Sequence, residues 1–396
     1  MFDSLFIGMS GLQTFSNGLK VIGNNVANLN TPGFKTSSTS FSDMYYANGG
    51  SGNTWGNGSM MVGSGVTANQ SFVNFKAGDT RQTGNPLDLN VNGEGFFITK
   101  DTKDQSVSYT RDGQFQFDKN GVLVSRTTGH EVQGLGASGG LSPISLNGLR
   151  ISPPKVTSQV VLNGNLSSSA TDFSVSNVTV IDALGGSHTL TLNFKPKTAA
   201  SGTWTVSLQD GGTEVATGEI SFVGGIPLAG SDKLTLAYAP KNVTSSDITF
   251  DFSSNVTSFD SGTTSTLAVN SSNGYAVGSL TQAQFDAQGV LQLTYSNGQT
   301  AKGSQVALAW FTTNAALTQS GQGGFTNASN ENLHVGAAGT GALGSIGSSQ
   351  IEGSNVDLST EFSNLIVTQR GYQASSRIVS TANDMLQDLY DMKGHR

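Results

Sequence analysis

The chain contains no cysteine and only four histidines among its 396 residues. The absence of cysteine excludes disulfide scaffolds, thiolate metal sites and cysteine nucleophiles. The four histidines are isolated in the sequence and leave little room for a histidine-based metal site. We therefore expect no metal, no cofactor and no catalytic residue, and the sequence points away from an enzyme.

Charge is also scarce, because charged residues make up 12% of the chain, about half the usual quarter. The net charge is −7 and the 20 lysines and arginines are scattered, which disfavours nucleic acid as a partner. Hydrophobic residues still supply 36% of the chain, enough to form cores, so a disordered acidic chain is excluded.

Long apolar runs are missing as well. No stretch approaches the roughly 18 residues of a membrane-spanning helix, so we expect no membrane partner. The N-terminus lacks the basic segment of a cleaved secretion signal, because the first cation is Lys20. We expect a chain that is cytosolic or that leaves the cell without a cleaved leader.

Residues 1–30 have the pattern of a helix with a repeated apolar stripe. Apolar residues recur every seven positions and a second row lies three positions later, which is the a and d spacing of a coiled coil. The residues expected to pack are Leu5, Leu12, Phe15, Leu19, Ile22 and Val26. Four glycines (Gly8, Gly11, Gly18 and Gly23) each cost about 1 kcal/mol relative to alanine, so the helix needs a partner. An ordinary amphipathic helix buried on its own core is the alternative.

Residues 356–396 predict a matching helix. Asp357 can cap its first turn, and apolar residues form two adjacent stripes along it. The residues expected to pack are Leu358, Phe362, Leu365, Tyr372, Val379, Met385, Leu386 and Leu389. Helices are thus predicted at the two ends of the chain and almost nowhere between, and the simplest arrangement is that they pair.

The interior is predicted to form β-structure, because short apolar alternations are separated by glycine and asparagine turns. Two hairpins are clear, one joining 178–182 to 190–194 and one joining 114–118 to 122–124. The predicted fold class is α+β and multidomain, with paired, coiled-coil-like terminal helices and two mostly-β domains.

Composition shifts and proline-rich or serine-rich boundaries predict a nested domain organisation. The expected parts are a helical domain from 1–30 and 356–396, an extended connector at 31–70, an inner β domain from 71–149 and 273–355, and an outer β domain at 150–272 inserted in the inner one.

Glycine-rich motifs do not indicate cofactor chemistry. Residues 134–139 match GxGxxG, but Ser142 and Pro143 follow where a dinucleotide site needs a helix. A GxSxG match at 136–140 lies in the same loop without a strand–helix elbow. The paired carboxylates of a glycosidase converge only in three dimensions, so a secreted β-rich carbohydrate-active enzyme or adhesin stays open as a remote alternative.

Motifs at both ends resemble the rod and hook family of bacterial flagellar axial proteins. The stretches 24–35, 355–361 and 369–373 carry this resemblance, and rod, hook and hook-junction subunits share them. The interior stretches 182–190 and 274–280 resemble hook subunits most closely. The residues that match the family motifs are Asn24, Asn25, Asn28, Pro32, Gly33, Phe34, Asp357, Gln369, Arg370 and Tyr372.

The resemblance implies a structural subunit that polymerises into a curved helical tube, which encloses an export channel and transmits torque from rod to filament as a universal joint. The implied partners are further copies of the chain, the distal rod protein, the hook–filament junction protein, the hook cap protein, the hook-length ruler protein and the flagellar type III export apparatus. The implied location is the extracellular hook, reached without a cleaved signal peptide. A distal rod or hook-junction subunit of the same family is the alternative.

The glycine content of residues 1–30 also predicts when the N-terminal helix folds. Ordering its backbone costs roughly 1–2 kcal/mol of conformational entropy per residue. An isolated helix with four glycines does not gain enough free energy to offset this cost. We expect the helix to fold only when its own chain and neighbouring subunits bury it.

Overall fold

The computed structural model of the chain is mostly β-structure with one long helix at each end. Helix α1 spans Phe2–Ala27, α2 spans Leu358–Gly394, and the short 3-10 helix η1 spans Asn314–Ala316. The prediction of helices at the two ends and strands between them is confirmed. The described residues are 2–44, 46–48, 61–136, 139–198, 202–327, 332–341 and 343–394.

The chain folds into two compact units. The first contains residues 1–147, 283–292 and 302–396, and the second contains residues 148–282 and 293–301. Both long helices belong to the first unit. The finer division into helical domain, connector, inner and outer β domains stays a prediction.

Short strands fill both units. Those of the first are β1 (Ser37–Asp43), β2 (Tyr46–Asn48), β3 (Met61–Gly63), β4 (Val66–Val73), β5 (Thr80–Gln82), β6 (Leu89–Asn92), β7 (Phe96–Lys100), β8 (Val107–Thr110), β9 (Phe115–Phe117), β10 (Leu123–Ser125), β11 (Glu131–Leu135), β12 (Leu141–Pro143), β27 (Leu317–Gly321), β28 (Gly324–Asn327), β29 (Leu333–Ala337), β30 (Ser345–Ser348) and β31 (Gln350–Glu352). Those of the second are β13 (Ile151–Ser152), β14 (Gln159–Asn165), β15 (Phe173–Ile181), β16 (Ser187–Pro196), β17 (Thr203–Asp210), β18 (Thr213–Val223), β19 (Ile226–Pro227), β20 (Lys233–Tyr238), β21 (Ser246–Asp251), β22 (Val256–Thr257) and β23 (Ala268–Ser272). Strands with residues in both units are β24 (Gly278–Phe285), β25 (Val290–Tyr295) and β26 (Thr300–Phe311).

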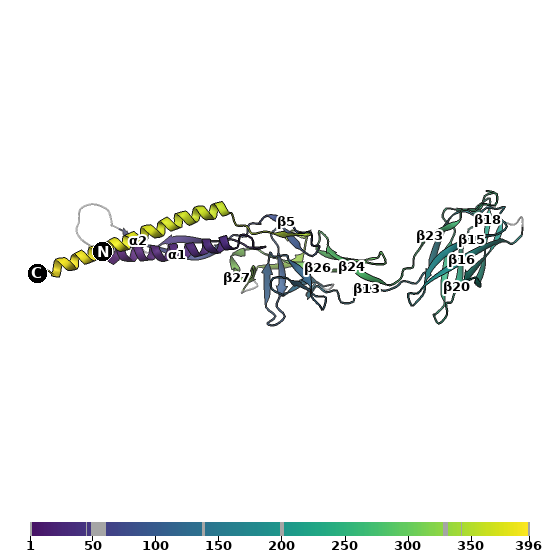
Figure 1. Cartoon of the computed structure of the whole chain (residues 1–396), viewed down its shortest axis with the longest axis horizontal. Coiled ribbons are helices and arrows are strands. Elements are labelled where there is room, and N and C mark those ends of the chain that lie inside the picture. The colour runs from purple at the N-terminus through teal and green to yellow at the C-terminus, as the bar shows by residue number, and fades with distance from the viewer. Residues whose placement is uncertain are drawn as a thin grey trace. The chain divides into compact units, whose positions relative to one another are not determined.

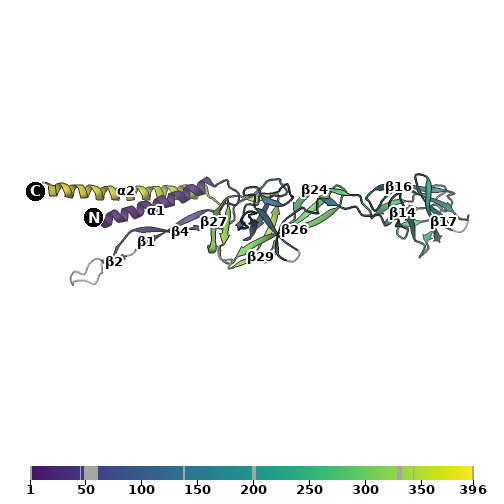
Figure 2. The ribbon, with the colours of Figure 1, turned by 90° about the horizontal axis from the view of Figure 1, so that it is seen from below.

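The helices α1 and α2 lie side by side in the first unit (Figures 1 and 2). Strands β1 and β4 pair antiparallel, with Ser37 opposite Val73, and both contact α1. Strand β1 and most of β4 lie in the range 31–70 that is predicted as an extended connector. Pairing gives the backbone N–H and C=O groups of this polar segment hydrogen-bond partners, which explains why strands form where composition alone suggests a linker.

The core of the first unit lies on a sheet that runs through β26, β11, β7, β8, β28 and β27 in that order. Its centre is aromatic: the ring of Phe311 lies 4.9 Å from that of Tyr109 and 5.9 Å from that of Phe96. Edge-to-face contacts of this kind add to the burial of apolar surface. In the same unit, β9 and β10 pair with Phe117 opposite Leu123, which confirms one predicted hairpin.

The second unit contains two five-stranded sheets. One runs β20-β21-β14-β22 with β23 beside β14, and the other runs β15-β16-β17-β18-β19. Buried residues alternate with half-buried ones along β16 and with exposed ones along β20, as expected for strands with one face on a core. Val178 of β15 lies opposite Leu190 of β16, which confirms the other predicted hairpin. One apolar cluster, drawn from residues 160–269, fills this unit.

Candidate functional site

The predicted packing residues of the helix pair differ in burial and fall into three groups. Ile22 is buried, at 8% exposure. The half-buried residues are Leu5, Leu12, Phe15, Leu19, Val26, Leu365, Val379 and Leu386. The exposed residues are Leu358, Phe362, Tyr372, Met385 and Leu389. The shared packing role of the whole set therefore stays a prediction.

Small and polar side chains are the ones most deeply buried on the two helices, and most of them lie outside the predicted set. On α1 they are Gly8, Gly11, Thr14, Gly18 and Asn25, and on α2 they are Glu361, Thr368, Ser375 and Ala382. The four on α2 recur every seven residues. That spacing is visible in the sequence, but a search for apolar rows passes over it because three of the four are polar.

The helices approach closely because these positions lack bulk. A Cβ atom added to Gly8 would lie 2.7 Å from Val379 Cγ2, and one added to Gly371 would lie 2.5 Å from Phe15 Cζ. Real Cβ contacts are not that short. Three of the four glycines that weaken α1 as an isolated helix, Gly8, Gly11 and Gly18, therefore lie against α2. Leu12, one position after Gly11, lies about 100° away around the helix.

Large apolar side chains of the helix pair remain in solvent. Phe6 is 61% exposed, Phe362 is 50% exposed and Val367 is 69% exposed. An open hollow along the pair is lined in part by Phe6, Met9 and Tyr372. Extended apolar surface on one chain marks an interaction site, so these exposed side chains of α1 and α2 together form the candidate assembly surface.

Asn25 connects the helix pair to strand β1 through side-chain hydrogen bonds. Its Nδ2 donates hydrogen bonds to the Ser37 carbonyl at 2.8 Å and to Glu361 Oε1 at 3.0 Å, and its Oδ1 accepts from the Ser37 N–H at 3.0 Å. Burial raises the pKa of the Glu361 carboxyl, while the bond from Asn25 opposes that shift. One family-motif asparagine thus connects α1, α2 and β1.

Glu352 is the centre of a buried ionic cluster next to the helix pair. Its Oε1 lies 2.5 Å from Lys35 Nζ and its Oε2 lies 3.0 Å from Arg111 Nη1, and all three side chains are at most 3% exposed. Lys35 also donates to the Lys76 carbonyl at 2.8 Å, and Arg111 Nη2 donates to the Gly93 carbonyl at 2.6 Å. Burial lowers the pKa of both the Lys35 ammonium and the Arg111 guanidinium, and the facing Glu352 carboxylate opposes both shifts.

Gly33 takes a backbone conformation that fits it against the β-structure. Its φ is +69°, and an added Cβ would lie 2.4 Å from the Asp112 backbone nitrogen. Its N–H donates to the Glu352 carbonyl at 2.9 Å. Only glycine adopts this φ without strain and also allows so close an approach.

Polar side chains organise the chain on both sides of this cluster. Asn28 Nδ2 donates to the Asn24 carbonyl at 2.9 Å. The half-buried Pro32 and Phe34 complete the turn after α1. Asp357 Oδ1 accepts from the Ser359 N–H at 2.9 Å and so caps α2 as predicted.

Three family-motif residues lie apart from the contacts of Asn25 and the Glu352 cluster. Gln369, Arg370 and Tyr372 are exposed on α2. No described residue of the chain forms a hydrogen bond or ion pair with the Arg370 guanidinium.

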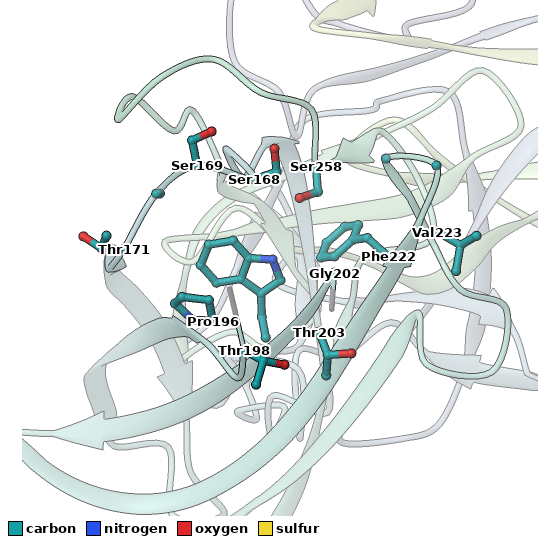
Figure 3. Close-up of a pocket in the computed structure, with 14 residues that line it drawn as sticks. Ser168, Ser169, Thr171, Pro196, Thr198, Gly202, Thr203, Phe222, Val223 and Ser258 are labelled. Atoms are coloured by element: carbon teal, nitrogen blue, oxygen red, sulfur yellow. The ribbon is translucent and has the colours of Figure 1, made fainter. Parts of the chain in front are cut away.

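Histidine and carboxylate side chains of the described residues do not gather as the ligands of a metal ion would. Within the described ranges, no three histidine, aspartate or glutamate side chains lie close enough to hold a metal ion. A hollow of about 700 Å³ in the second unit is lined by hydroxyl and apolar residues such as Ser168, Thr171, Pro196 and Phe222 (Figure 3). None of the described residues that line it is ionisable.

The glycine-rich motifs begin at the end of strand β11 and continue between β11 and β12. Gly134 lies in β11, which pairs with β12, and a dinucleotide fingerprint needs a helix at that point. Residues 137 and 138 of these motifs lie outside the described residues. Over the described parts of the chain, neither long helix is apolar enough to cross a membrane.

Three family models of the bacterial flagellum match the chain. Residues 5–35 match the flagella basal body rod protein, residues 90–181 match the flagellar hook protein FlgE/F/G D1 domain, and residues 348–392 match the flagellar basal body rod FlgEFG protein C-terminal region. These matches define a rod and hook class of protein. Lys35, Arg111 and Glu352 each come from a different matched segment, so the ionic cluster joins all three.

Hook proteins are similar to the chain over nearly its whole length. It is 31% identical to the flagellar hook protein FlgE of Escherichia coli (strain K12) and 32% identical to that of Salmonella typhimurium (strain LT2), in each case over 97% of this chain and 98% of the relative. The crystal structure of Helicobacter pylori flagellar hook protein FlgE2 aligns with a TM-score of 0.44 and 13% identity, over 64% of this chain and 94% of that one. The chain belongs to the flagellar hook protein family.

Substituting Gly8→Ala should loosen the helix pair, because the new methyl group meets the stiff Val379 side chain. Overpacking costs about 1–3 kcal/mol, against a gain of about 1 kcal/mol in helix propensity. The matched control is Gly23→Ala, where nothing lies within 4 Å of the added Cβ and only the gain remains. The measurement is the temperature at which polymers of each variant lose their helical circular dichroism signal. Equal shifts for the two variants would contradict close packing at Gly8.

Substituting Glu352→Gln should destabilise the first unit by about 3–5 kcal/mol, because Lys35 and Arg111 would remain buried without a counter-charge. Asp101→Asn is the control, since that carboxylate and its partner His130 are each a quarter exposed, and partly exposed pairs contribute about 1 kcal/mol or less. The free energy of unfolding is measured by urea denaturation, with the amide exchange of β7 used to monitor the unfolding of the first unit. A loss for Glu352→Gln no larger than that of the control would show that the cluster does not hold the unit together.

Proposed function

We propose that this chain is a structural subunit of the bacterial flagellar hook, with no catalytic role, which polymerises into a curved tube that transmits torque from rod to filament. The observation that carries the proposal is similarity to hook proteins over 97% of the chain. The rod-named models match only the two ends, residues 5–35 and 348–392, so a distal rod or junction subunit is not favoured.

The exposed apolar face of the helix pair supports self-assembly. Tyr390 is 74% exposed and Met392 is 81% exposed, and burying such side chains against neighbours contributes roughly 1.5–3 kcal/mol each. The helix pairs form an inner, coiled-coil-like layer around the channel, and the two β domains lie outside it. The predicted packing residues serve both the pair and its contacts with neighbours.

The hook location suggests how the subunit reaches its place and what it meets. Export proceeds through the flagellar type III apparatus without a cleaved leader, and a hook-length ruler protein acts in the same process. Subunits add beneath a hook cap protein, and the finished tube joins the distal rod protein to the hook–filament junction protein. Bending is aided by the scarcity of charge, because only 12% of the residues of the chain are charged and hydroxyl and amide groups form many near-equivalent, water-mediated contacts.

Folding of α1 should accompany assembly. In the monomer, residues 2–27 should exchange their amide protons rapidly, because the glycine-rich helix lacks the neighbours that bury its apolar face. In the polymer the same amides should be protected. Hydrogen exchange with mass spectrometry on both forms measures this, with β7 as an internal reference protected in both. Protection of residues 2–27 in the monomer would contradict coupled folding.

Removing most of the second unit should leave polymerisation intact. Lys155 and Tyr275 exchange backbone hydrogen bonds of 2.9 and 3.1 Å, so an Asn-Gly turn can replace residues 156–274 without moving them. The apolar cluster of that unit lies entirely inside the removed range, so the deletion leaves no part of that core behind. Electron microscopy should show secreted subunits forming tubes of altered curvature or stiffness. A folded variant that forms no tubes would place an assembly determinant in the removed range.

A further inference from the structure

A pocket of about 230 Å³ lies in the first unit among α1, α2 and β1. Apolar side chains such as Ile22, Phe41 and Val367 form much of its wall. Glu361, only 8% exposed, also lines it. The pocket is therefore a mostly apolar hollow that contains one buried carboxyl group.

Two oxygen atoms of this pocket are left without hydrogen-bond partners. Glu361 Oε1 accepts from Asn25 Nδ2 at 3.0 Å, but no described group bonds to Glu361 Oε2 or to Thr39 Oγ1, and both atoms are buried. A buried acceptor without a donor is costly. Burial accordingly raises the pKa of the Glu361 carboxyl. The pocket thus fits a cationic donor carried on an apolar stem.

Arg370 supplies a group of this kind on the surface of α2. Its guanidinium carries five N–H donors in a planar fork, is exposed, and pairs with no described residue of its own chain. It cannot reach its own Glu361, because nine residues of helix separate the two by about 13.5 Å along the axis and place them on opposite sides. The pair can form only between two chains.

We propose that, in the polymer, Arg370 of one subunit enters the Glu361 pocket of a second copy and donates to Glu361 Oε2 and Thr39 Oγ1. The inference rests on the proposed assembly into tubes. Phe41, 46% exposed, and Val367, 69% exposed, line the pocket and would cover the apolar stem of the arginine. In a tube the contact is heterologous: each subunit gives its Arg370 to one neighbour and receives the Arg370 of another, so the contact repeats along the helical array.

A double-mutant cycle on purified tubes tests the pairing. Glu361→Gln and Arg370→Gln should each lower the disassembly temperature, and the double variant should be no less stable than the weaker single variant. Arg377→Gln is the matched control: Arg377 is also exposed on α2, and its effect should add to that of Glu361→Gln. Additive effects for Arg370 and Glu361, or coupling of Glu361 to Arg377 or Lys20 instead, would overturn the proposal. So would unchanged tube stability in Glu361→Gln, which would indicate water in the pocket.

Cross-linking gives a readout that does not depend on stability. The chain has no cysteine, so Ser38→Cys in the pocket and Gln373→Cys, one turn from Arg370, would be its only thiols. A short bifunctional thiol reagent should link neighbouring subunits of the tube into a ladder. Ser38→Cys with Gln387→Cys, about 21 Å further along α2, should give none. Tubes without the ladder would overturn the pocket contact and leave the hook function standing, whereas a wild-type chain that forms no tubes would count against the function itself.

Discussion

The ionic cluster around the buried Glu352 carboxylate is the interaction on which the first unit depends. It holds Lys35, which lies just after α1, and Arg111, which lies within the β-structure, while Glu352 itself lies just before α2. Segments about 240 and 320 residues apart in sequence are thereby fixed at one point. Such a cluster is strongly destabilising to break because each member is buried, and it lies where forces on the helices would pass to the β-structure.

Close helix packing and exposed apolar surface are two consequences of one arrangement. Glycine, serine and threonine occupy the positions between α1 and α2, so the helices approach closely without using most of their large side chains. Those side chains, among them Phe362 and Ile366, are left on the outside. A chain that needed only to be stable alone would bury them, whereas a subunit that polymerises keeps them for its neighbours.

The second unit differs from the first because its core comes from one continuous segment of the chain. Its apolar cluster is drawn entirely from residues 160–269. Its two five-stranded sheets are each formed by strands of this unit. Lys155 and Tyr275 meet at the base of that segment as hydrogen-bonded neighbours. A unit closed in this way carries its own apolar core, and its chain enters and leaves between two hydrogen-bonded neighbours.

The sequence by itself determined the two terminal helices, the β-rich interior, the hairpins at 114–124 and 178–194 and the cap at Asp357, because each depends on local periodicity or turn chemistry. It also determined the family, because the motifs near both ends are contiguous. Only the tertiary structure decided which helix faces meet. The apolar heptads point to Leu12 and Leu19, but the close contact is made one position earlier, at Gly11 and Gly18, since packing distance depends on the partner's bulk and not on the hydrophobicity of one helix. The Glu352 cluster was hidden for the same reason: three charges distant in sequence form a site only when the fold brings them together.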